Sequence, residues 1–88
     1  MIRRHIIVEG RVQGVWYRQT CHEMAMAEGV TGWVRNNDDG SVEAALEGDP
    51  AAVDRVVSWM RIGPARAVVT LVNVVDESPR GEQSFRVV

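Results

Sequence analysis

An α+β sandwich is the fold class that the sequence predicts, and three observations predict it. Extended β-branched runs alternate with two amphipathic helical segments in the order β-α-β-β-α-β-β. The pattern fits into 88 residues, enough for one core, so we expect residues 1–88 to form a single domain. An Asp-Gly turn joins the middle strands as a hairpin. This order is the split βαβ, ferredoxin-like arrangement, with an antiparallel sheet of four to five strands and two helices on one face.

The first half of the chain contains two predicted strands around one helix. A short β-branched run predicts a strand over residues 4–9. Apolar residues recur at three- and four-residue spacing over residues 17–28, which predicts a helix that ends at Gly29. Residues 30–36 are predicted as the second strand, and residues 37–40 as the hairpin turn.

The second half begins with alternation over residues 41–47, which predicts a strand with one buried and one solvated face. On the solvated face we expect Glu43 and Glu47 to promote solubility rather than act as an acid–base pair. Asp49 and Pro50 are typical of a helix start, and this helix buries Val53, Val56, Val57 and Met60. Further strands are predicted over residues 67–75 and 84–88, separated by a loop over residues 77–82.

Composition excludes several classes of protein. Ten basic residues, all arginine, stand against twelve acidic ones, and the net charge of −2 argues against nonspecific nucleic-acid binding. The chain has one cysteine, Cys21, so it forms no internal disulfide. Its only histidines are His5 and His22, so we expect no metal site. The apolar run near Met1 is too short for a signal peptide or a membrane span, so we expect a cytoplasmic protein that does not bind membranes.

The loop after the first strand is the most informative segment. Between Glu9 and Glu23 there is no acidic residue, although first turns of helices normally favour them. One interpretation is that the free N–H groups of the helix start bind an external anion, with Gly10 and Gly14 bending the backbone and Arg18 adding a two-pronged contact. The alternative is a plain strand-to-helix connection with a solvated arginine. The spacing matches neither the dinucleotide fingerprint nor the P-loop, so any bound phosphate would be small.

Asn36 ends the second predicted strand, directly before the hairpin turn. Taken alone, an asparagine at this position is explained by turn chemistry, because its side chain bonds the local backbone.

Two segments together resemble the two signatures of the acylphosphatase family. They are GRVQGVWYR at residues 10–18 and GWVRNNDDGSV at residues 32–42, followed by Gly48. GPARA at residues 63–67 and Phe85 are also similar to the family, so the resemblance covers nearly the whole chain. Two departures occur at Trp16 and Tyr17, where the family often has a smaller residue and Phe.

The resemblance implies hydrolysis of the carboxyl–phosphate bond of small acyl phosphates, without metal or cofactor. Arg18 matches the family's phosphate-binding arginine, and Asn36 matches its water-orienting asparagine. The backbone cradle for phosphate, or for sulfate in its place, matches the loop residues Gln13, Gly14, Val15, Trp16 and Tyr17. We expect a monomer that binds a small acyl phosphate and no nucleic acid.

Two other classes of protein stay open at this point. One is a nonenzymatic ferredoxin-like module that binds RNA on its sheet, although such sheets need stacking aromatics and this chain has one Phe and one Tyr. The other is an accessory module that keeps the anion-binding loop but has lost turnover.

Overall fold

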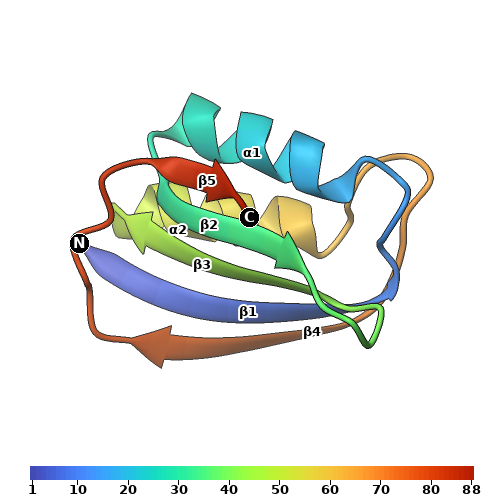
Figure 1. The fold of residues 1–88 in the computed structure, drawn as a ribbon. Coiled ribbons are helices and arrows are strands. Elements are labelled where there is room, and N and C mark those ends of the chain that lie inside the picture. Colours follow the sequence, from blue (N-terminus) through green and yellow to red (C-terminus); the bar gives the residue numbers. More distant parts are fainter.

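A computed structural model describes residues 1–88, and it contains one sheet and two helices (Figure 1). The elements are β1 (Ile2–Arg11), α1 (Tyr17–Glu28), β2 (Thr31–Asn36), β3 (Val42–Gly48), α2 (Pro50–Met60), β4 (Val68–Glu77) and β5 (Phe85–Val87). The strand order is β4-β1-β3-β2-β5, and both helices lie on one face of the sheet. The predicted ferredoxin-like sandwich is confirmed. Neither helix is long and apolar enough to cross a membrane.

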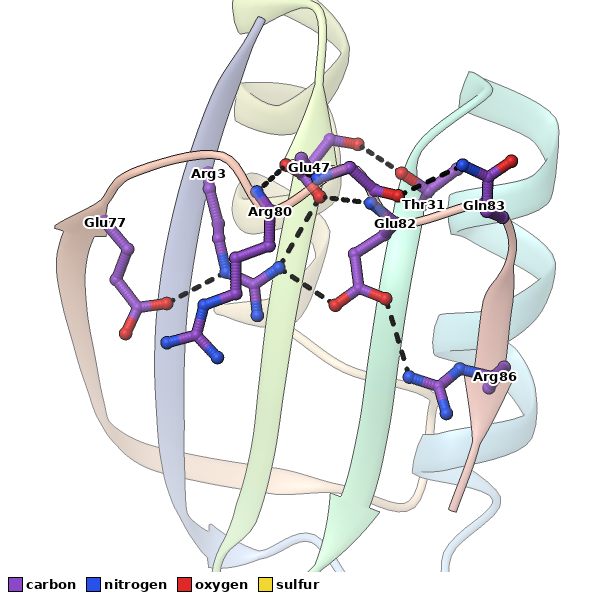
Figure 2. Close-up of polar contacts among 9 residues, drawn as sticks. Arg3, Thr31, Glu47, Glu77, Arg80, Glu82, Gln83 and Arg86 are labelled. Carbon is purple, nitrogen blue, oxygen red and sulfur yellow. Dashed lines mark hydrogen bonds and ion pairs between the residues drawn. The ribbon is translucent and has the colours of Figure 1, made fainter.

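The expectation of a wholly antiparallel sheet is wrong for the last strand. β1, β2, β3 and β4 pair antiparallel, but β5 pairs parallel with β2. The reason is where β4 ends: Glu77 lies opposite Arg3, at the end of the sheet where β2 begins. Residues 78–84, here called the strap, cross this end to the opposite edge (Figures 1 and 2). β5 therefore starts beside the start of β2 and runs in the same direction.

The core lies between the helices and the sheet. Alternate residues of the central strands, such as Ile6, Val8, Val34 and Leu46, are fully buried, as the period-two pattern requires. The helices cover them with buried side chains at helical spacing: Tyr17, Cys21 and Ala25 from α1, and Val53, Val56, Val57 and Met60 from α2. The predicted apolar faces of both helices are confirmed; Met24, which shares the apolar spacing in α1, is half-buried.

The predicted solvated face of β3 is wrong at both acidic positions. Glu47 is completely buried, because the strap crosses above it (Figure 2). Its carboxylate accepts hydrogen bonds from the backbone N–H groups of Arg80, Gly81 and Glu82, at 2.5, 3.0 and 2.9 Å. Glu43 is half-buried, forms an ion pair with Arg35 and is hydrogen-bonded to Nε2 of His5. Sequence alternation identified the face, but it does not show that another segment covers it.

Candidate active site

The connection between β1 and α1 has an unusual backbone. Gly14 has a φ of 73° and Trp16 a φ of 66°, and Trp16 is the only residue other than glycine with a positive φ. A left-handed conformation costs a bulky residue about 1–2 kcal/mol. Strain of this kind persists where the surrounding structure enforces it, and it is common at binding sites.

The amides of this connection have no partner within the protein. No hydrogen bond outside the regular elements has its donor among the backbone N–H groups of Gln13 to Tyr17. Trp16 caps α1 without a side-chain hydrogen bond, and the first turn of the helix contains no acidic residue. The positive end of α1 is therefore uncompensated, which favours binding of an anion.

Tyr17 fixes the start of α1 against the core. Its ring is buried and packs on Trp59, with the ring centroids 5.3 Å apart. Its hydroxyl donates a 2.7 Å hydrogen bond to the carbonyl of Met60, at the end of α2. Burial, with a smaller effect from Cys21, raises the pKa of Tyr17 far above its ordinary value, so the hydroxyl keeps its proton. Tyr17 thus anchors the loop and is not a titrating group of the site.

Gln13 joins the loop to the β2–β3 hairpin. Its side-chain amide donates hydrogen bonds to the carbonyls of Asn37 and Ser41, at 2.7 and 2.9 Å. The loop and the hairpin lie at the same end of the sheet (Figure 1). This contact holds the loop beside the end of β2, where Asn36 lies.

Arg18 and Asn36 line one cavity of about 210 Å³. Its other lining residues are Val12, Gly14, Trp16, Tyr17, Gln19 and Val87. Asn36 Oδ1 is buried without any hydrogen-bond partner, and such an atom costs about 1–3 kcal/mol unless a ligand or water satisfies it. An arginine, an unsatisfied acceptor and a loop with free amides therefore meet at one place.

The other loop residues divide between two cavities. Gly14, Trp16 and Tyr17 line the cavity of Arg18, whereas Gln13 and Val15 line a second cavity that shares only Gly14 with the first. Trp16 lines the first cavity and is 73% exposed, so it lies at the mouth of that cavity.

Sequence reasoning missed Val87 as a wall of the first cavity. Val87 belongs to β5 and pairs with Val34 of β2, so it reaches the site only because β5 joins the edge beside β2. No local signal in the sequence places it there.

Cys21 and His22 lie outside the cavity. Burial raises the pKa of Cys21 to about 12, so its thiol stays protonated and unreactive. His22 is half-buried and packs against Phe85, with ring centroids 5.9 Å apart. Both positions are typical of packing residues and not of catalytic ones.

These features define a class of protein: a ferredoxin-like sandwich whose first strand–helix loop has free backbone amides beside a cavity lined by an arginine. The acylphosphatase family model matches residues 4–87 of the chain. The curated acylphosphatase of Gloeobacter violaceus is 50% identical over 98% of this chain and 92% of its own length, and that of Haloarcula marismortui is 52% identical over 97% and 93%. The crystal structure of acylphosphatase from Bacillus subtilis superposes with a TM-score of 0.97 at 37% identity, covering 100% of this chain and 99% of the other. The chain belongs to the acylphosphatase family.

Proposed function

We propose that the protein hydrolyses small acyl phosphates to a carboxylate and inorganic phosphate. Family membership supports the reaction, and one observation supports the site: Asn36, whose Oδ1 has no hydrogen-bond partner, lines the same cavity as Arg18. Arg18 and the amides of Gln13 to Tyr17 hold the phosphoryl group, and a bound phosphate or sulfate occupies the same place.

Arg18 and the amides stabilise the charge of the transition state. In phosphoryl transfer this charge spreads over the equatorial oxygens, so positioning and electrostatics provide most of the catalysis. The planar guanidinium makes two parallel contacts with such oxygens, whereas a lysine supplies a single point charge.

Asn36 orients the attacking water. Its carbonyl oxygen accepts a hydrogen bond from the water, and its amide is too weak a base to remove a proton. The water oxygen forms a bond to phosphorus, the bond from phosphorus to the acyl oxygen breaks, and its electron pair leaves with the carboxylate. The proton of the water passes to a phosphate oxygen.

The leaving group explains why we propose no metal, cofactor or strong general acid. A carboxylic acid has a pKa of about 4, so the carboxylate leaves at neutral pH without protonation. We further propose that residues 1–88 act as one domain, as a monomer and in the cytoplasm.

Hydrolysis of benzoyl phosphate, followed by ultraviolet absorbance, tests the proposal. We expect steady turnover that chelating agents do not reduce. A folded protein that binds phosphate without turnover would support the accessory module instead.

The open face of the sheet, which the helices do not cover, has a composition that argues against RNA binding. Three acidic residues of this face, Glu43, Glu47 and Glu77, form ion pairs there. Its only aromatic side chains are His5 and Trp33, and the guanidinium of Arg35 lies 5.3 Å from the centre of the Trp33 ring. A filter-binding assay with single-stranded RNA is expected to show no retention.

A further inference from the structure

Half of the ten arginines form ion pairs, and three of the other five lie around one loop. Arg3, Arg4, Arg35, Arg55 and Arg86 are paired with carboxylates. Among the five unpaired ones, Arg18 lines the first cavity, and Arg11 and Arg66 line the second. In a protein of net charge −2, this is a local concentration of uncompensated positive charge.

The fold brings Arg11 and Arg66 together through the pairing of β1 with β4. Arg11 is the last residue of β1 and lies opposite Val68, the first residue of β4, two positions after Arg66. The register of this pairing shifts between Glu9 and Gly10, because β4 has one extra residue, Thr70, at this point. Gly10 has a φ of 122°, and a Cβ atom there would lie 2.1 Å from the carbonyl oxygen of Val68. The glycine therefore lets β1 and β4 stay close beyond the shift, where Arg11 pairs with Val68.

The second cavity, of about 460 Å³, is lined by Arg11, Gln13, Gly14, Val15 and Arg66. No acidic residue lines it, and Val15 is its only apolar residue. Gly14 lines both cavities, so the two cavities are neighbours.

We propose that the second cavity binds a negatively charged group on the acyl part of the substrate. The protein then favours acyl phosphates that carry a second anionic group, a carboxylate or a phosphate, over those with a neutral acyl group. This inference rests on the proposed function, because the phosphoryl group must occupy the first cavity.

The expected effect is on binding and is moderate in size. Arg11 and Arg66 are both exposed, so each contact with an anion is partly screened by water and by salt. The second anion lies away from the reacting phosphorus, so its contacts are equal in the ground state and the transition state. They lower KM and leave kcat unchanged.

The experiment compares succinyl phosphate, which has a terminal carboxylate, with acetyl phosphate, which has none. The variants are Arg11→Gln, Arg66→Gln and the double variant. Arg61→Gln is the matched control, because Arg61 is exposed and unpaired but lines neither cavity. We expect the double variant to lose about fivefold in kcat/KM on succinyl phosphate, through KM, and less than about twofold on acetyl phosphate. High salt should remove the difference, and the control should show no change.

Two results overturn the inference. Equal losses on both substrates would show that the arginines attract any phosphate. No loss on either substrate would show that they do not bind the substrate. Failure of the proposed function is a different result, in which the folded wild-type protein hydrolyses neither substrate.

Discussion

Arg3 Nη1 lies 3.5 Å from Glu47 Oε2, and both side chains are buried beneath the strap (Figure 2). Arg3 also forms ion pairs of 3.0 Å with Glu77 and Glu82, so the guanidinium has three carboxylates around it. Glu47 in turn accepts three backbone N–H groups of the strap. The pair thus holds the strap in place. The strap leads to β5, and Val87 of β5 forms part of the wall of the first cavity.

Removing the carboxylate of Glu47 is expected to destabilise the fold. Glu47→Ala leaves three N–H groups and part of the charge of Arg3 without a partner, so we expect a loss of about 3 kcal/mol in the free energy of unfolding. Urea denaturation measures it. The matched control is Glu23→Gln, an exposed α1 residue without an ion pair, which should change stability by less than about 0.5 kcal/mol. Equal stability of Glu47→Ala and the wild type would contradict the role of the pair.

The same carboxylate makes stability depend on pH. Burial alone would raise the pKa of Glu47, but the N–H groups of Glu82, Gly81 and Arg80 and the charge of Arg3 lower it below its ordinary value. A folded-state pKa below the unfolded one adds stability above the unfolded pKa of about 4.3, and this stability is lost as pH falls through the folded pKa. Urea denaturation from neutral to acidic pH should show this loss in the wild type. The loss of stability should be smaller in Glu47→Gln. If stability falls with pH equally in the variant and the wild type, Glu47 is not the group responsible.

Relief of the strained backbone at Trp16 is expected to stabilise the protein. Trp16→Gly removes the cost of the left-handed conformation and little buried surface, because the ring is mostly exposed. We expect the free energy of unfolding to rise by about 1 kcal/mol, measured by urea denaturation. A marked loss of stability would show that the indole packs more strongly than its exposure indicates. Trp59→Gly, which removes a half-buried ring in contact with Tyr17, should be destabilising by comparison.

Gln13 is expected to act as a positioning residue through its side chain. Gln13→Ala removes the two hydrogen bonds to the hairpin and lets the loop move relative to Asn36. Since the loop amides bind phosphate in our proposal, KM for benzoyl phosphate should rise, with kcat/KM falling about tenfold. Gln19→Ala is the control, because Gln19 lines the cavity of Arg18 but its side chain forms no hydrogen bond with the protein. Equal effects of the two substitutions would argue against the positioning role.

The sequence predicted the local features of the fold well, because each depends on a short pattern. The helix over residues 17–28 is confirmed with both its limits, and Pro50 is the first residue of α2, as expected. β1 extends beyond the predicted residues 4–9, because its pairing with β4 continues past the register shift at Gly10. The family motifs singled out Arg18 and Asn36, and in the structure these two residues line one cavity, although they come from different elements.

The features that the sequence did not predict depend on contacts between distant segments. Alternation in β3 placed Glu47 on the face away from the helices, but the strap that buries it comes from residues more than thirty positions later. The parallel pairing of β5, and thus the position of Val87, follows from where β4 ends. Arg66 lines the second cavity because the register of β1 with β4 places it near Arg11. No local sequence pattern reveals this register.

The central claim is that Arg18 holds the phosphoryl group while Asn36 orients water. The most direct measurement compares Asn36→Ala and Arg18→Lys in kcat for benzoyl phosphate and in the dissociation constant for inorganic phosphate, obtained by isothermal titration calorimetry. We predict that Asn36→Ala lowers kcat about 100-fold with phosphate affinity nearly unchanged, whereas Arg18→Lys impairs both. Near wild-type turnover in either variant, or a loss of phosphate binding in Asn36→Ala as large as its loss of turnover, would contradict the account.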